Sequence, residues 1–201
     1  ERPAAALPDK GGLVVQGKKS LADSLFTVQQ YMLAYPYSCL EQRVSRASAT
    51  GDVESWRETM NDLGAHFDSD GFLKYFPVLE WGSPILSAYV LVLAHERQWA
   101  IPPEALERLS GALADFVDGK VRVPALVTQA YHWARLNALD AITRYGGGSI
   151  AAIQSIPVDY NAVPTSVVLD SLNSWRRLLG KDARNEMSTR SQGRCVRGRL
   201  A

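Results

Sequence analysis

The stretch GSPILSAYVLVLAHERQWAIPPEALERLSGALADFV, residues 82–117, predicts two helices of different character. Ser83 followed by proline is typical of a helix N-terminus. The run from Ile85 to Trp99 is apolar on most sides, so we expect that helix to lie in the interior. The next helix starts at the run Pro102-Pro103-Glu104 and carries apolar residues on one face only. The pair therefore predicts a buried helix covered by a second helix that has apolar residues on one face.

The same alternation between wholly apolar and one-sided helices continues along the chain from Ser20. A simple bundle would show more uniform faces, whereas this pattern suits an inner ring of helices covered by an outer ring. We therefore predict an all-α fold, an incomplete α/α toroid with alternating inner and outer helices, in which residues 72–82 pack as irregular structure. Besides the two helices above, the predicted helices run from Ser20 to near Pro36, from Ser38 onward, through Trp56, Met60, Leu63 and Phe67, and over Pro124–Arg144, Ser149–Ser155, Thr165–Leu179 and Ala183–Leu200.

Composition excludes several classes of protein. The chain has 201 residues, enough for one large domain, and 22 Lys plus Arg against 21 Asp plus Glu give a net charge of +1. With so small a net charge, the protein has no overall positive electrostatic potential that would attract nucleic acid or an anionic membrane. The longest nearly uncharged apolar stretch, Ile85–Ala94, is too short to span a bilayer. Residues 1–19 are rich in Pro, Ala, Gly and Lys, which predicts a linker with one short extended segment before a domain at residues 20–201.

The two cysteines, Cys39 and Cys195, are too few for a disulfide framework and have no zinc-ligand spacing. The chain begins at Glu1 without an initiator Met or a signal-peptide pattern, so we expect it to be a piece of a longer protein. Any targeting signal would then lie outside it.

The segment YPYSCLEQR, residues 35–43, contains the candidate reactive residues. Ser38 and Glu41 have the spacing of a capping box, which predicts a helix N-terminus at Ser38 and places Cys39 in the first turn. Unpaired N–H groups and the helix dipole favour a thiolate there. Gln42 lies three residues on, on the same face. A thiolate beside a primary amide can attack it, expel ammonia and leave an internal thioester between Cys39 and Gln42.

The run YPYSCLEQRVSRA resembles the thioester motif of the α2-macroglobulin and complement family, specifically of its bacterial branch. Three further segments resemble later blocks of the bacterial thioester domain in the same order, so that roughly residues 20–179 are covered. A bare Cys-x-Glu-Gln occurs often by chance, but the flanking tyrosines and the ordered blocks make the signal specific. The three segments are DSDGFLKYFP, GSPILSAYVLVLAHERQWAIP and VPTSVVLDSLNSWRRL.

The resemblance implies an α/α toroid that acts as a covalent trap for proteases. Cleavage of a bait segment elsewhere in a larger protein would expose the thioester, and Gln42 would be joined to a lysine amine or hydroxyl of the attacker while Cys39 is released. This is a single-use acyl transfer without a cofactor, so the chain is not expected to be an enzyme. Tyr35, Tyr37 and Leu40 are expected to shield the bond from water. Glu41 is interpreted as a helix cap, with a polarising role as its second interpretation.

The resemblance also implies partners and a location. Proteases would be the covalent targets, and other domains of the parent chain would cover the thioester. It implies a periplasmic protein of host defence, with an inner-membrane anchor, where one exists, outside this chain. The alternative function is a noncatalytic scaffold or binding domain of the same fold, in which the thioester is absent or hydrolysed.

Other functions have weaker support in the sequence. Complement relatives use a histidine to direct the acyl group toward hydroxyls, but no histidine here matches that block, so packing or capping is expected for all three and amines should be preferred over hydroxyls. A toroid hydrolase or cyclase would need paired inward carboxylates, for which no motif is present, and a cysteine hydrolase does not explain Gln42. The DSDG segment is better explained by a turn than by calcium. The arginines after residue 180 are interpreted as a solvated face. The residues weighed are His66, His95, His132, Asp68, Asp70, Glu80, Asp115 and Asp140.

Overall fold

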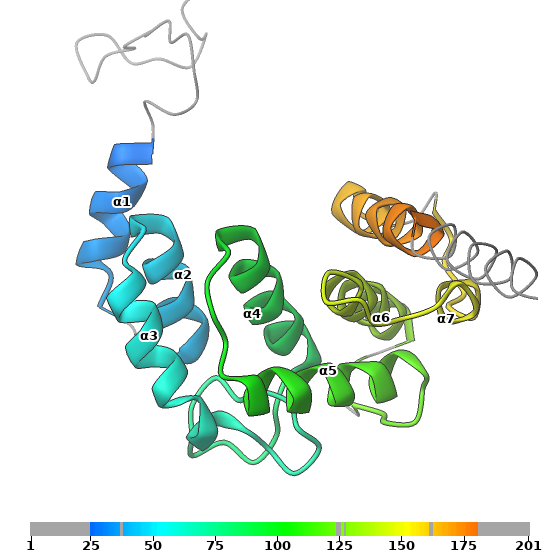
Figure 1. Cartoon of the computed structure of the whole chain (residues 1–201), viewed down its shortest axis with the longest axis horizontal. Helices are drawn as coiled ribbons and strands as arrows, with labels where there is room; N and C mark the ends of the chain where they lie inside the picture. The colour runs from blue at the N-terminus through cyan, green and yellow to red at the C-terminus, as the bar shows by residue number, and fades with distance from the viewer. Residues whose placement is uncertain (1–24, 37, 124–125, 127, 161–162, 181–201) are drawn as a thin grey trace, which may run out of the picture.

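The structure is a computed structural model that describes residues 25–180, except 37, 124–125, 127 and 161–162 (Figure 1). The predicted linker at residues 1–19, the helix at Ala183–Leu200 and Cys195 lie outside the described residues. The described part is all-α, and its β pairing is confined to two isolated bridges, so the predicted class is confirmed. The elements are α1 (Leu25–Ala34), α2 (Leu40–Thr50), α3 (Val53–Asn61), the 3-10 helix η2 (Leu63–His66), α4 (Pro84–Arg97), α5 (Pro103–Val117), α6 (Thr128–Thr143) and α7 (Ile150–Gln154), followed by a helix over residues 165–180.

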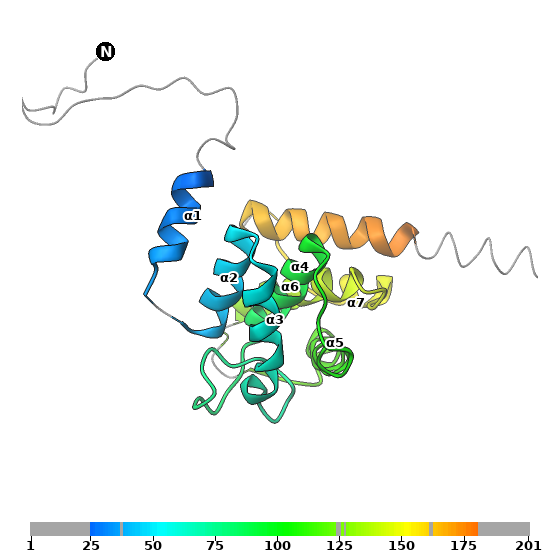
Figure 2. The same ribbon diagram turned by 60° about the vertical axis from the view of Figure 1, so that its left-hand side comes forward.

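The helices form two layers along an arc. Helices α2, α4 and α6 pack side by side in succession, α3 covers α2, and α5 lies across both α4 and α6 (Figures 1 and 2). The helix over residues 165–180 lies beyond α6 at the far end from α1. From α2 to α6, alternate helices therefore lie in alternate layers. The predicted match of wholly apolar helices to the inner layer holds for α4 but not for α2, whose buried residues lie on one face.

Helix α4 is the central element of the core. Leu86, Val90 and Leu91 of this helix are at most 1% exposed. The helix carries apolar side chains on most of its sides, so it can bury much of its surface. Ser83 accepts a hydrogen bond from the backbone N–H of Leu86 and Pro84 follows it, so the predicted N-terminus is confirmed. Within the described residues no helix is long and apolar enough to cross a membrane.

Three helix boundaries differ from the sequence prediction. The stripe from Trp56 to Phe67 is not one helix, because α3 ends at Asn61 and a 3-10 turn continues from Leu63. The apolar spacing survives this break, since a 3-10 turn also places residues three apart on one side. Helix α2 begins at Leu40, not Ser38, and α6 begins at Thr128.

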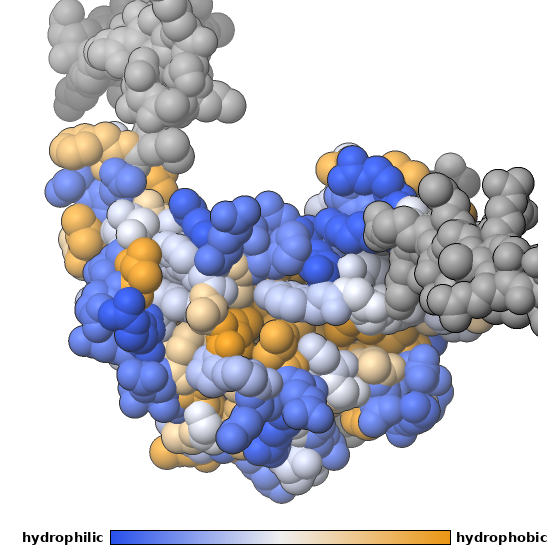
Figure 3. All heavy atoms as spheres, in the orientation of Figure 1, coloured by the Kyte–Doolittle hydropathy of each residue, from blue (hydrophilic) through white to orange (hydrophobic). Residues whose placement is uncertain are grey.

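Helix α1 exposes much of its apolar surface. Phe26 and Leu33 are 67% and 60% exposed, and apolar side chains are visible over this helix in Figure 3. The first predicted helix is therefore present, and Val28 on it is 48% exposed.

The irregular segment between η2 and α4 is organised around Asp68. One carboxylate oxygen of this buried residue accepts the backbone N–H of Phe72 at 2.8 Å, and the other accepts that of Gly82 at 2.7 Å. A Cβ at Gly82 would lie 2.6 Å from the Phe72 carbonyl oxygen, so only glycine fits this close approach. These bonds support the turn interpretation of the DSDG segment. We call residues 67–83 the Asp68 loop.

The Asp68 loop is packed in part and exposed in part. Phe72 and Leu73 are buried in the core, as predicted for a segment with so many aromatic residues. The expectation that the whole segment packs is wrong, because several of its apolar side chains face solvent. They are Phe76, Val78, Leu79 and Trp81, at 47%, 92%, 42% and 66% exposure.

Candidate thioester site

The N-terminus of α2 brings Cys39 and Gln42 together. Cys39 is the N-cap, with extended backbone angles of φ −64° and ψ 163°. Its backbone N–H donates to the side-chain Oε1 of Gln42 at 3.2 Å, and its side chain faces the backbone N–H of Gln42 in return. The two side chains therefore fold toward each other in the arrangement of a capping box. The geometry brings the carboxamide of Gln42 back over the residue that carries the thiol.

This arrangement corrects the predicted helix start. The sequence prediction assigned the capping box to Ser38 and Glu41, but the box consists of Cys39 and Gln42, one residue later. Both pairs have the same spacing of three residues, so spacing alone could not separate them. Glu41 is exposed in the first turn, where its charge favours the helix dipole without capping the helix. The two residues that the motif singles out are thus themselves the cap.

Burial protects the sulfur of Cys39. The residue is 6% exposed, and Leu40 beside it is fully buried among the core residues. Gln42 is half-buried, so its carboxamide lies between the core and solvent. The thiol is therefore more deeply buried than the carboxamide.

The other predicted site residues have different surroundings. The backbone carbonyl of Tyr35 accepts a hydrogen bond from Nη2 of Arg46 at 2.7 Å, and its half-buried ring lies 5.4 Å from that of Tyr31. Arg46 thereby ties the segment before the site to the next turns of α2. Tyr37 lies outside the described residues. The shielding role of the tyrosines stays a prediction.

Tyr75 belongs to the site and is absent from the sequence prediction of it. Its carbonyl oxygen accepts the backbone N–H of Leu40 at 2.9 Å, which satisfies the first free donor of α2. Burial raises the pKa of Tyr75, and the negative charges of Glu41 and of a Cys39 thiolate raise it further, against a hydrogen bond to Ser83 that lowers it. The phenol therefore lies in the electrostatic field of the site. No local sequence signal reveals this contact, because the two segments are more than 30 residues apart.

His66 and His95 have packing contacts, in line with the sequence prediction. Buried His66 is hydrogen-bonded through Nδ1 to the Lys74 carbonyl oxygen at 2.9 Å, and the His95 ring packs edge-on against Tyr145 at 5.7 Å. His132 lies on α6, and burial lowers its pKa.

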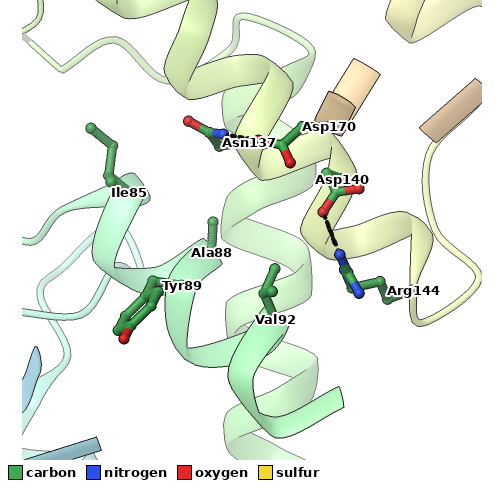
Figure 4. A pocket seen from close by; sticks show the side chains of 8 residues that line it. All are labelled: Ile85, Ala88, Tyr89, Val92, Asn137, Asp140, Arg144 and Asp170. Carbon is green, nitrogen blue, oxygen red and sulfur yellow. Dashed lines mark hydrogen bonds and ion pairs between the residues drawn. The ribbon is translucent and has the colours of Figure 1, made fainter. Parts of the chain in front are cut away.

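A second group of polar residues lines a cavity of about 250 Å³ between α4, α6 and the helix over residues 165–180 (Figure 4). Asp140, with its side chain 3% exposed, accepts from Arg144 at 3.0 Å and from Arg177 at 2.6 Å. Asn137 donates to Asp170 at 2.6 Å. Burial raises the pKa of Asp170, and the charge of Asp140 adds to the effect. We call Asn137, Asp140, Arg144, Asp170 and Arg177 the Asp140 network.

These contacts give the carboxylates structural tasks. Asp140 and Asp68 were weighed as inward acids of a hydrolase, but both oxygens of Asp140 bind arginines and both oxygens of Asp68 bind backbone N–H groups. Asp115 is paired with Lys120 at the surface. Over the described ranges, no group of three or more His, Cys, Asp or Glu side chains could hold a metal ion.

Comparison with known proteins defines the class of fold. The helical arrangement is that of part of the bacterial alpha-2-macroglobulins. Native alpha-2-macroglobulin from Escherichia coli, in a crystal structure from domain MG7 to the C-terminus, matches with a TM-score of 0.64 at 18% identity over 77% of this chain and 28% of that one. The cryo-EM structure of the native E. coli protein matches with a TM-score of 0.65 at 18% identity over 77% of this chain and 11% of that one.

A crystal structure of Salmonella alpha-2-macroglobulin reacted with methylamine matches with a TM-score of 0.56 at 18% identity, over 66% of this chain and 10% of that one. This chain thus spans a small part of the length of these neighbours. No protein-family model matches it, and a search of curated proteins finds no relative by sequence. At this identity the likeness establishes the fold.

Proposed function

We propose that this chain is the covalent capture domain of a bacterial α2-macroglobulin-like protease inhibitor. Its reactive group would be an internal thioester between Cys39 and Gln42. The observation that carries the proposal is the reciprocal contact of these two residues at the N-terminus of α2, where the Gln42 oxygen lies 3.2 Å from the Cys39 backbone nitrogen. In this arrangement the carboxamide of Gln42 is held at the residue that carries the thiol, which is the pairing that an internal thioester requires.

The helix N-terminus suits the formation of the bond. In the reaction, the thiolate form of Cys39 attacks the side-chain carbonyl carbon of Gln42. The new carbon–sulfur bond forms as the carbon–nitrogen bond breaks, and ammonia leaves with a proton from the surroundings. The backbone N–H of Cys39, which donates to the Gln42 oxygen, would stabilise the oxyanion of the tetrahedral intermediate.

Opening of the thioester transfers the acyl group once. A lysine amine of the target attacks the Gln42 carbonyl carbon, an amide bond forms, and the carbon–sulfur bond breaks. The sulfur leaves as the Cys39 thiolate, and the proton lost by the amine passes to the thiolate or to solvent. The chain is consumed in the reaction, so we propose a capture domain and not an enzyme, with no cofactor in the step.

The fold likeness supports the larger context of the proposal. Two layers of alternating helices suit an α/α toroid, of which the described arc would be a part. We propose that other domains of the parent protein cover the site, that attacking proteases are its covalent partners, and that it acts in the periplasm in defence against them. Exposed apolar residues near the site, on the Asp68 loop and α1, leave surface for such domains to cover.

The experiment incubates the protein with trypsin and separates the products under denaturing, reducing conditions. The proposal expects a band of summed mass in which Gln42 is joined to a trypsin lysine, and no such band from Cys39→Ala. Matched amine and alcohol probes should label Gln42 mainly with the amine, since no histidine of the chain matches the one that directs the acyl group toward hydroxyls in complement relatives. Equal conjugation by Cys39→Ala, or stronger labelling by the alcohol, would contradict the mechanism.

The alternative is a noncatalytic scaffold of the same fold, and the 6% exposure of Cys39 is the observation in its favour, since small buried cysteines are common in cores. A chain in which Gln42 never reacts would favour this alternative over covalent capture.

A further inference from the structure

Arg46 connects the body of α2 to the segment that leads into the candidate site. Its guanidinium Nη2 donates a hydrogen bond to the carbonyl oxygen of Tyr35 at 2.7 Å. Tyr35 directly follows α1, which lies beside α2 (Figure 2). The bond joins residues 11 positions apart in the sequence, and both Cys39 and Gln42 lie between them. The reactive pair is therefore enclosed in a loop of chain that Arg46 closes.

Helix geometry places Arg46 on the face of α2 that carries the reactive pair. Residues three or four positions apart are neighbours on the surface of a helix, and Cys39, Gln42 and Arg46 follow one another at those spacings. Long side chains on a helix point back toward its N-terminus. The half-buried side chain of Arg46 thus extends toward the turn that contains Gln42 on its way to Tyr35.

The held carbonyl restricts how the chain enters the N-cap. Pro36 follows Tyr35, and a proline fixes its own φ angle and limits the residue before it to extended conformations. With the Tyr35 carbonyl bound by Arg46, the backbone between this point and Cys39 has little freedom left. At the N-cap, Cys39 has extended backbone angles and its N–H meets the Gln42 Oε1 at 3.2 Å. Helix ends fray readily, so a restraint on the entering chain helps to preserve this contact.

We propose that Arg46 is a positioning residue of the Cys39–Gln42 site, which holds the carbonyl of Tyr35 so that Cys39 keeps the N-cap conformation in which it contacts Gln42. The inference rests on the proposed function for its purpose, because attack of the sulfur on the amide carbon depends on how well the two groups are held in reach of each other. Arg46 transfers no proton and no acyl group. Its charge suits the task, since a charged donor makes a stronger hydrogen bond than a neutral one.

The test measures hydrogen exchange of the Cys39 backbone N–H by NMR, because this group donates to Gln42. All samples are first treated with methylamine, which removes any thioester and leaves the carbonyl oxygen of residue 42 in place. Arg46→Met keeps the apolar stem and removes the donor. It should raise the exchange rate of the Cys39 N–H about tenfold, while the buried amides of α4 around Leu91 exchange as in the parent. In untreated protein, the fraction of chains that are one ammonia lighter should fall in Arg46→Met.

Two further variants separate the hydrogen bond from other effects. Arg46→Lys retains a charged donor on a long stem and should restore most of the protection of the Cys39 N–H. Gln29→Ala is the matched control, since Gln29 also joins α1 to α2, by a hydrogen bond from its Nε2 to the Ala49 carbonyl at 3.2 Å in the last turn of α2. Its loss should leave exchange at Cys39 unchanged.

Unchanged exchange at Cys39 in Arg46→Met would overturn the proposal, and so would an equal rise in Gln29→Ala, which would assign the effect to the packing of α1 as a whole. A rise that extends equally to α4 would show general destabilisation, and Arg46→Lys behaving like Arg46→Met would show that the donor is not the cause. Either result would overturn the proposal. Failure of the proposed function differs from all of these, because the lighter species is then missing from the parent as well, while exchange at Cys39 still reports on Arg46.

Discussion

The N-terminus of α2 and the Asp140 network contain similar kinds of polar residue but use them differently. In the network, buried Asp140 binds Arg144 and Arg177, and Asn137 binds Asp170, so the charges satisfy one another. At the α2 site, the backbone N–H of Cys39 donates to the side-chain oxygen of Gln42 at 3.2 Å, and the thiol of Cys39 is not held in a disulfide. Polar side chains that satisfy one another through ion pairs and hydrogen bonds hold helices together. A reactive site instead keeps two reactive groups close to each other.

The comparison predicts separate responses to mutation. Changes in the Asp140 network should alter the free energy of unfolding and leave Cys39 reactivity as it is. Changes at the α2 site or in the Asp68 loop should alter that reactivity. The following predictions run from the largest expected effect to the smallest.

Asp140→Ala should destabilise the fold most. It leaves two arginines without their buried partner, of which the Arg144 side chain is 9% exposed, and breaking a buried pair in this way costs about 3 kcal/mol or more. Urea unfolding followed by circular dichroism measures the loss. Asp115→Ala, at a surface pair with Lys120 in which the aspartate side chain is 50% exposed, is the control and should change stability by less than about 1 kcal/mol. Equal losses in the two variants would show that the network is not structural.

Asp68→Asn should destabilise by about 2 kcal/mol. An amide offers only one acceptor oxygen, so either the Phe72 or the Gly82 N–H loses its partner and faces an NH₂ group instead. Since the Asp68 loop carries Tyr75 to Cys39, we also expect faster alkylation of the Cys39 thiol in the folded protein. Asp70→Asn, at an exposed position of the same turn, is the control. A stability loss with no change in alkylation would separate the loop from the site.

Asp170→Asn should have the smallest effect, and one of opposite sign. The pKa of Asp170 is raised in the folded state by burial and by Asp140, so the folded protein binds this proton more tightly than the unfolded chain. Stability from this group is therefore present below the ordinary aspartate pKa and is lost as the pH rises through the raised value. The asparagine variant should be slightly more stable than the parent at pH 7, and the gap should close near pH 3. A variant that is less stable at pH 7 would contradict this sign.

The sequence predicts the helices better than their ends. The cap at Ser83 and the wholly apolar face of α4 are local features, and the structure confirms both. The end of α3 at Asn61 and the start of α2 at Leu40 are not encoded in apolar spacing, because a 3-10 turn preserves the stripe and two capping boxes one residue apart share the same spacing.

The sequence predicts the part of the candidate site that is formed by residues close together in the chain. Cys39 and Gln42 lie three residues apart, so helix geometry alone places them together. Tyr75 could not be predicted, since it reaches Leu40 through a backbone carbonyl across more than 30 residues. The exposure of Phe76 and Trp81 was also not predicted. The aromatic content of this segment indicates a packed segment, whereas these two side chains face solvent.

The most direct test of the central claim is the chemical state of residue 42. Intact mass and peptide mapping of the purified chain should find a species one ammonia lighter than the sequence, which gains one methylamine and releases the Cys39 thiol on treatment. Any chain in which water has opened the bond should carry glutamate at position 42, and Cys39→Ser should retain glutamine there. An unmodified Gln42 beside a free Cys39 thiol throughout the population, with or without methylamine, would contradict the account.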